Sequence, residues 1–142
     1  MIADLTTFHT YVGRVMMHCQ TIEHDIMLIY AGMKAGDMDE HLKEIKEKKL
    51  TLGQVLKHLK DLDRTDDNHF FSDEDYSLLK QIRDIRNHWA HEAYCEFVYS
   101  NNDDDFIRQA RRLENDHNRL EKLSKTIEDV RLRALRLYGR IE

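Results

Sequence analysis

The 142-residue chain contains no proline, and its five glycines never cluster. Phosphate-binding loops of the Walker type and dinucleotide-binding turns need clustered glycines, because their backbone must approach the phosphates closely. The sequence therefore argues against nucleotide binding by either of those two motifs. Long apolar runs are also missing. No stretch approaches the roughly 20 residues that a membrane-spanning helix needs, so we expect no membrane partner.

Cysteine is scarce, and Cys19 and Cys95 are the only two. Both lie in segments with helical periodicity, so we predict buried, reduced thiols and no disulfide. The first ten residues, MIADLTTFHT, have no basic region followed by an apolar block, so we expect no secretory signal. These features favour a cytoplasmic protein. The length, with 41% hydrophobic and 35% charged residues, favours one globular domain over residues 1–142.

Basic residues are fewer than acidic residues over the whole sequence. A net charge of −5 argues against tight, sequence-independent nucleic-acid binding by a monomer. The charge is uneven, however, because residues 106–142 carry 10 basic and 6 acidic side chains, a local balance of +4. A basic C-terminal helix next to a cleft can guide a polyanion locally. The charge pattern thus permits an RNA substrate without requiring one.

Apolar residues recur at spacings of three and four along most of the chain, and no segment alternates with the period of two typical of strands. The predicted long helices span residues 4–34, 73–99 and 104–138. Shorter helices are predicted over residues 38–49 and 52–62. Residues that favour helix N-caps precede four of these segments: Asp4, Asp37, Thr51 and Ser72. The predicted fold is an all-α, antiparallel helical bundle.

The stretch IRDIRNHWAHEAYCEF, residues 82–97, places polar side chains in an otherwise apolar helix. The core face of that helix contains Leu78, Ile82, Ile85, Trp89 and Ala93, and Arg86 lies at its edge. A second stripe contains Asn87, His91, Tyr94 and Val98. Such a helix packs on two sides, once in its own core and once against a partner. We therefore expect Arg86 and His91 to flank a groove that a second chain closes.

Each of these polar residues also has a structural interpretation. Arg86 can form a buried ion pair, for which Glu23 in the first helix is a candidate partner. His91 can be an ordinary interface histidine, and Tyr94 a packing tyrosine. The group HWAHE, residues 88–92, suggests a metal, but its first histidine and its glutamate point away from the His91 stripe. No cysteine or acidic ligand set joins them, so we predict no metal and no cofactor.

The residues RNHWAH resemble the Arg-Asn-x-x-x-His pattern of HEPN domains, a family of helical domains named for higher eukaryotes and prokaryotes nucleotide-binding. The match consists of Arg86, Asn87 and His91, with four residues between arginine and histidine, as the family's R-x(4–6)-H motif requires. The helix order before the motif, including LTLGQVLKHL, is also similar to that of many bacterial HEPN proteins. The resemblance implies a HEPN-like bundle and a homodimer in which two facing motifs form one metal-independent ribonuclease site.

The residue types suit that chemistry, because RNA carries its own nucleophile, the 2′-hydroxyl. The resemblance assigns His91 the role of general base or acid, since an imidazole titrates near neutral pH. It assigns Arg86 the role of binding the phosphate, because a guanidinium can donate two hydrogen bonds to phosphate oxygens as negative charge builds up on them. Asn87, one turn before His91, orients the imidazole or contacts the phosphate. The implied products carry a 2′,3′-cyclic phosphate and a 5′-hydroxyl.

One departure from the family pattern concerns a tyrosine. In HEPN toxins paired with minimal nucleotidyltransferase antitoxins, a tyrosine stands two residues after the motif histidine. Here Ala93 holds that place and Tyr94 follows it, as a weak candidate for substrate binding. The departure argues against membership of that subgroup and against nucleotide addition to the tyrosine. The resemblance still implies an RNA-cleaving toxin of a toxin–antitoxin or phage-defence pair, with a cognate antitoxin as partner.

Two other interpretations stay open. The first is a non-catalytic HEPN module that binds RNA, a nucleotide or a protein partner, which fits the acidic net charge. The second is a scaffold built on the last long helix.

Overall fold

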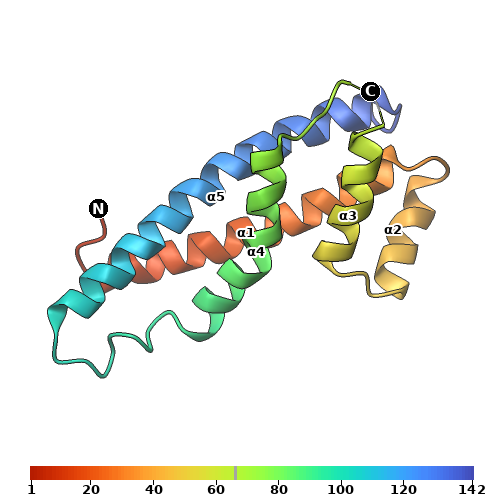
Figure 1. Ribbon diagram of the computed structural model, residues 1–142. Helices are drawn as coiled ribbons and strands as arrows, with labels where there is room; N and C mark the ends of the chain where they lie inside the picture. The colour runs from red at the N-terminus through yellow and green to blue at the C-terminus, as the bar shows by residue number, and fades with distance from the viewer. Residues whose placement is uncertain (66) are drawn as a thin grey trace.

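The computed structural model describes residues 1–65 and 67–142, and these ranges contain five helices and no strand. The prediction of an all-α helical bundle is confirmed. The helices are α1 (Leu5–Met33), α2 (Met38–Glu47), α3 (Leu52–Asp63), α4 (Asp73–His91) and α5 (Asp103–Leu137). Figure 1 shows α1 and α5 side by side, α4 crossing α1, and the α2–α3 pair at the end of α1 that is distant from the N-terminus. None of the described helices is apolar over enough of its length to span a bilayer.

The helices begin where the sequence predicts because their caps are local features. A side-chain oxygen accepts a hydrogen bond from a first-turn backbone N–H at each predicted cap, namely Asp4, Asp37, Thr51 and Ser72. Thr51 and Gln54 exchange both bonds of a capping box, at 3.2 and 2.9 Å. These bonds satisfy backbone donors that have no partner inside the helix.

The direction of α5 corrects the predicted antiparallel arrangement in part. Contacts between α1 and α5 keep the same order along both helices, since the Met1 amino group lies 3.6 Å from Glu114 and Asp25 lies 3.2 Å from Arg131. These two helices are therefore parallel. α4 crosses α1 in the opposite overall direction, and the turns after it return the chain to the N-terminal end of α1 (Figure 1). Because α5 starts there, it has to follow the direction of α1.

Another correction concerns the end of α4. The helix stops at His91, before the predicted end at residue 99, and residues 92–99 form turns. The reason is aromatic packing, because Tyr94 and Phe97 close over Phe8 with ring-centroid distances of 5.5 and 5.1 Å. Burying these rings offsets the loss of further helical turns. The predicted stripe through Tyr94 and Val98 is therefore wrong beyond His91.

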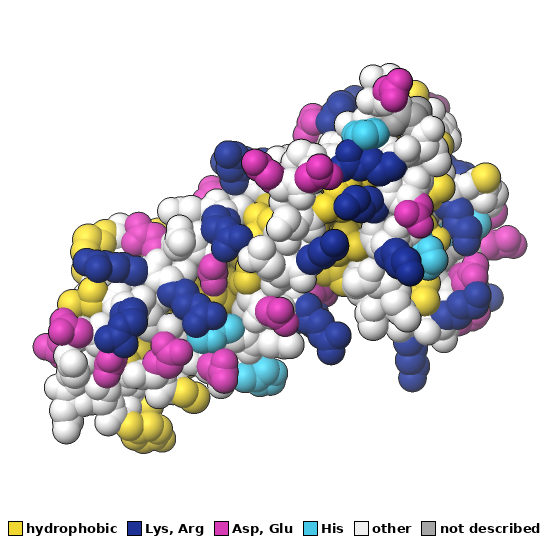
Figure 2. All heavy atoms as spheres, viewed as in Figure 1, with side chains coloured by type: hydrophobic (Ala, Val, Ile, Leu, Met, Phe, Trp, Pro, Cys, Tyr) yellow, Lys and Arg dark blue, Asp and Glu magenta, His cyan; other side chains and the backbone are white. Residues whose placement is uncertain are grey.

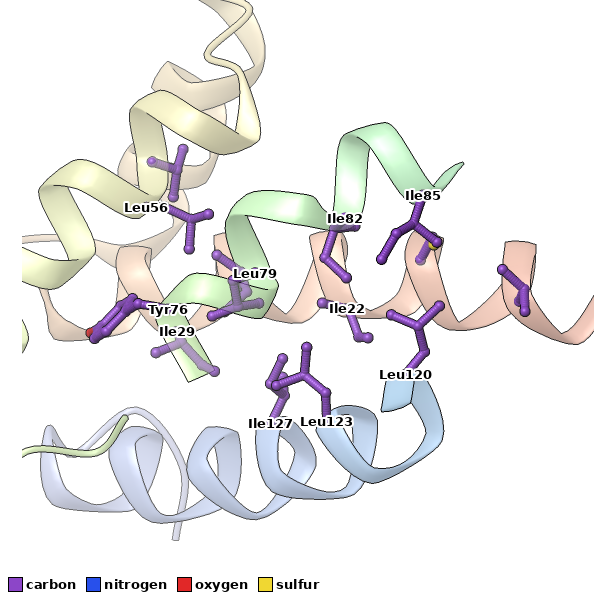
Figure 3. Packing of buried hydrophobic residues seen from close by; sticks show 14 of the residues in the cluster. Ile22, Ile29, Leu56, Tyr76, Leu79, Ile82, Ile85, Leu120, Leu123 and Ile127 are labelled. Carbon is purple, nitrogen blue, oxygen red and sulfur yellow. The ribbon is translucent and has the colours of Figure 1, made fainter. Parts of the chain in front are cut away.

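The core is built mainly from three helices. Figure 3 shows their apolar side chains interdigitating. Its buried aliphatic side chains include Ile22 and Ile29 of α1, Leu79 and Ile82 of α4, and Leu120 and Ile127 of α5. All of these are excluded from water, which supplies the main driving force for holding α4 against the α1–α5 pair.

The two thiols differ in their exposure to solvent, although the sequence predicts that both are buried. Cys19 lies in the core, where burial raises the pKa of its thiol to about 12 and keeps it unreactive. Cys95 is exposed, because it follows the end of α4 and not a continuing helix. Both are free, as predicted.

Candidate functional site

The motif RNHWAH, residues 86–91, forms the C-terminal end of α4. Trp89 anchors this end, because it is 2% exposed and its indole Nε1 donates to Asp116 Oδ2 of α5 at 2.8 Å. The rings of Trp89 and Phe8 of α1 also meet, with centroids 6.2 Å apart. The motif is therefore held in one orientation by contacts with both long helices.

His88 is buried and serves the fold. The Gln109 Nε2 atom of α5 donates to the Ala93 carbonyl at 3.2 Å and lies 2.9 Å from His88 Nε2. Since a carbonyl only accepts, the amide nitrogen faces both groups, and His88 Nε2 accepts. The proton of a neutral His88 ring then sits on Nδ1, 3.2 Å from Glu92. His88 is thus occupied by the docking of α4 on α5, whereas His91, three residues later, is exposed.

Asn87 and His91 lie on the outer side of the same helical turns. Both are exposed, and they are four residues apart, so their side chains are neighbours on the helix surface. Over residues 1–65 and 67–142, neither side chain makes a hydrogen bond or an ion pair. His91 contributes only its backbone carbonyl, which accepts from the Cys95 thiol at 3.7 Å. Both side chains are free to contact a ligand.

Arg86 forms the ion pair that its structural interpretation predicts. Its Nη1 atom lies 2.6 Å from both carboxylate oxygens of Glu23, and the two side chains remain 33% and 21% exposed. The pair ties α4 to α1. Nη2 and Nε of Arg86 make no hydrogen bond within the described chain, so the guanidinium keeps donors for a second anion.

Arg86 and His91 face different ways. They are five positions apart on a helix that turns by about 100° per residue, so their side chains diverge by about 140°. The Arg86 side chain turns toward Glu23 of α1, whereas His91 lies on the outer side. One chain alone therefore does not direct both groups at a single phosphate.

Tyr94 belongs to a separate cluster at the N-terminal end of α1. Its hydroxyl lies 2.6 Å from Nδ1 of His9, and its ring contacts those of Phe8 and His9. Burial raises the pKa of the Tyr94 hydroxyl. The structure thus separates Tyr94 from the stripe of Asn87 and His91. Nothing in the sequence signals the contact with His9, which lies 85 positions earlier.

A hollow of about 320 Å³ beside Arg86 contains a residue that the sequence analysis missed. Arg83, one turn before Arg86, lines it and is exposed without a hydrogen bond or ion pair in the described ranges. The other lining residues are Glu23, Met27, Leu50, Thr51, Leu52 and Arg86. The spacing of Arg83, Asn87 and His91 by four residues is visible in the sequence. The opposite wall of the hollow is not, since it comes from α1 and the start of α3.

Metal ligands do not converge here. Over residues 1–65 and 67–142, no group of three or more His, Cys, Asp or Glu side chains is placed to hold a metal ion.

No family model, no curated protein and no solved structure matches the chain. The candidate site therefore rests on its residues and their geometry.

Proposed function

We propose that the protein is a metal-independent endoribonuclease of the HEPN type, with Arg86, Asn87 and His91 as catalytic residues of a homodimer. The observation that carries the proposal is the pair Asn87 and His91. Among the described residues, they stand exposed at the end of α4 without a hydrogen-bond or ion-pair partner, while the neighbouring His88 and Trp89 are hydrogen-bonded to α5. A polar pair with no role in folding is available for a substrate.

The reaction follows from these residue types. His91 takes the proton of the RNA 2′-hydroxyl, and the 2′-oxygen forms a bond to the adjacent phosphorus. The bond from phosphorus to the 5′-oxygen breaks, and the leaving oxygen takes a proton from the imidazolium of a second copy. Arg86 and Asn87 donate hydrogen bonds to the non-bridging phosphate oxygens as charge accumulates. The products are a 2′,3′-cyclic phosphate and a 5′-hydroxyl.

The divergence of Arg86 and His91 supports the need for two copies. Because the two side chains of one chain diverge by about 140°, a phosphate that contacts His91 of one copy is better placed for Arg86 of the other. A two-fold axis supplies both groups twice, as an isologous dimer does. A toxin of a toxin–antitoxin or phage-defence pair is the biological role that fits such an enzyme, with the antitoxin covering the exposed end of α4.

The test is cleavage of total RNA by the purified protein in EDTA, with the product ends identified. We expect cyclic-phosphate ends, and a loss of rate of about 10²- to 10⁴-fold in His91→Ala, because that is the usual contribution of general acid–base catalysis. His58→Ala is the matched control, since His58 is an exposed histidine on α3. Equal cleavage by wild type and His91→Ala would show that the nuclease is a contaminant or uses another site.

The ion pair between Arg86 and Glu23 favours a second candidate function. An arginine held by both oxygens of a carboxylate stabilises the contact of α1 with α4, as in a non-catalytic HEPN module that binds RNA, a nucleotide or a protein. In that case neither wild type nor His91→Ala cleaves RNA, and Arg86→Ala lowers stability with no activity to lose. A cleaving wild type that loses its activity in His91→Ala excludes this alternative.

A further inference from the structure

We propose that the hollow between α1, α3 and α4 is a nucleotide subsite for single-stranded RNA. Arg83 holds a phosphate there, and the apolar side chains of Met27, Leu50 and Leu52 receive the base. This inference rests on the proposed function, because it assigns the substrate contacts beside the same motif.

The shape of the hollow suits one nucleotide. Its volume of about 320 Å³ lies at the lower end of the roughly 300–1,000 Å³ typical of small-molecule sites. Three partly exposed apolar side chains, Met27, Leu50 and Leu52, line it. Apolar side chains line most small-molecule sites, and here they can contact the flat face of any of the four bases.

The charges in the hollow favour an anion. Arg83 and Arg86 are three residues apart on one helix, where like charges repel each other. Glu23 binds Nη1 of Arg86 but leaves Arg83 without a counter-charge among the described residues. A phosphate held by Arg83 offsets this repulsion and accepts the N–H groups of the Arg83 guanidinium in charge-assisted bonds, which leaves Arg86 for the reacting phosphate.

Positive charge continues from the hollow along α3 and α4. Lys60 of α3 and Arg64, which follows α3, both lie over the ring of Tyr76 of α4, 5.5 Å from its centroid, so this flank of α3 faces α4. Arg64 is also ion-paired with Asp73 at 2.8 Å. Lys57 precedes Lys60 by one turn, and Lys80 is exposed on α4. Figure 2 shows Lys and Arg side chains gathered around apolar side chains over α3 and α4. Such a basic strip guides a polyanion even on a chain of net charge −5.

The spacing of residues along α4 places the hollow near the proposed cleavage site. Arg83, Asn87 and His91 follow each other at four-residue intervals, so Arg83 lies about 12 Å from His91 along the helix axis. The phosphate that Arg83 holds is thus distinct from the one that His91 of the same copy contacts. Arg83 therefore positions a neighbouring nucleotide and does not contact the reacting atoms.

The experiment measures binding without cleavage. A labelled, short 2′-O-methyl RNA lacks the 2′-hydroxyl nucleophile but keeps its phosphates, and its affinity is followed by fluorescence anisotropy over a salt series. We expect Arg83→Gln to raise Kd about tenfold and to reduce the salt slope by about 0.7, the loss of one phosphate contact on a single strand. Arg136→Gln, at an exposed arginine near the end of α5, is the matched control and should change neither quantity.

A second variant tests the apolar wall of the hollow. Leu50→Glu places a carboxylate there and should weaken RNA binding at least as much as Arg83→Gln, with thermal denaturation confirming that the protein is folded. The result that overturns the proposal is an unchanged Kd and salt slope in Arg83→Gln, or an equal loss in Arg136→Gln. Adenosine monophosphate is the second probe. If it binds as tightly as the RNA, the hollow is a mononucleotide site and the RNA subsite is wrong.

The subsite and the proposed function fail in distinguishable ways. If binding depends on Arg83 but wild type cleaves no RNA, the subsite stands and the ribonuclease does not. If cleavage depends on His91 but RNA binding does not depend on Arg83, the ribonuclease proposal holds and the subsite proposal is wrong.

Discussion

The motif RNHWAH has two sides that the rest of the chain treats differently. On one side, His88 and Trp89 are buried and bonded to polar side chains of α5. On the other, Asn87 and His91 are exposed, with no partner over residues 1–65 and 67–142. The difference teaches that two histidines three positions apart have unrelated roles. One specifies how α4 docks, and the other is left free for chemistry or binding.

Arg86 stands between these two sides. Like His88 and Trp89, it is at least partly buried and has a polar partner. Like Asn87 and His91, it keeps hydrogen-bond donors, Nη2 and Nε, that have no partner in the described chain. It can therefore serve stability and substrate binding together. Its substitution should affect both, whereas changes at the other motif residues should affect only one.

The largest expected effect on stability comes from the buried side. Trp89→Phe removes the Nε1 donor. Among the described residues, the Asp116 carboxylate, 8% exposed, then keeps only the Arg119 contact at 3.7 Å. We expect the free energy of unfolding to fall by about 2–3 kcal/mol, because a buried charge loses its hydrogen bond. Urea denaturation measures it.

The matched changes on the exposed side are Asn87→Ala and His91→Ala. Both should leave the free energy of unfolding within about 0.5 kcal/mol of wild type. If either of them destabilises the fold as much as Trp89→Phe, the division of the motif into two sides is wrong.

An intermediate effect is expected at the pair of Arg86 and Glu23. Arg86→Gln should lower the free energy of unfolding by about 1–2 kcal/mol, less than for a fully buried pair, because both side chains are partly exposed. A double-mutant cycle with Glu23→Gln measures the coupling. In the cleavage assay, Arg86→Gln should lose activity while Glu23→Gln keeps it. Loss of activity in both variants, in proportion to lost stability, would make Arg86 purely structural.

The smallest effect concerns another histidine pair, His18 of α1 and His117 of α5, whose rings lie 5.6 Å apart. Burial first, and then His117 and Arg14 against the opposing effect of Glu121, lowers the pKa of His18 below its usual 6.5. The folded state then binds this proton less tightly than the unfolded state does. The contribution of His18 to the stability of the folded protein is therefore complete above pH 6.5. It is lost as the pH falls through the lowered pKa of His18 in the folded state.

Urea denaturation at about pH 7.5 and about pH 5.5 tests this pH dependence. His18→Gln should reduce the loss of stability on acidification, and His58→Ala, at an exposed position on α3, should not. The same loss in wild type and His18→Gln would assign the effect to other groups.

Two of the wrong predictions share a cause. The sequence analysis extended α4 to residue 99 because the periodicity continues, but packing of Tyr94 and Phe97 on Phe8 ends the helix at His91. The exposure of Cys95 follows from the same early end. The parallel course of α5 was missed because helical periodicity contains no information on direction.

The sequence by itself determined the all-α class, the five helices of the described ranges and their starting points, because caps and apolar periodicity depend on residues within one or two turns. It also determined that Asn87 and His91 are neighbours on one helix surface. Only the tertiary structure decided the end of α4, the pairing of Arg86 with Glu23 and the hollow lined by Arg83. These features depend on contacts between residues far apart in the chain, whose packing and electrostatic energies no local pattern contains.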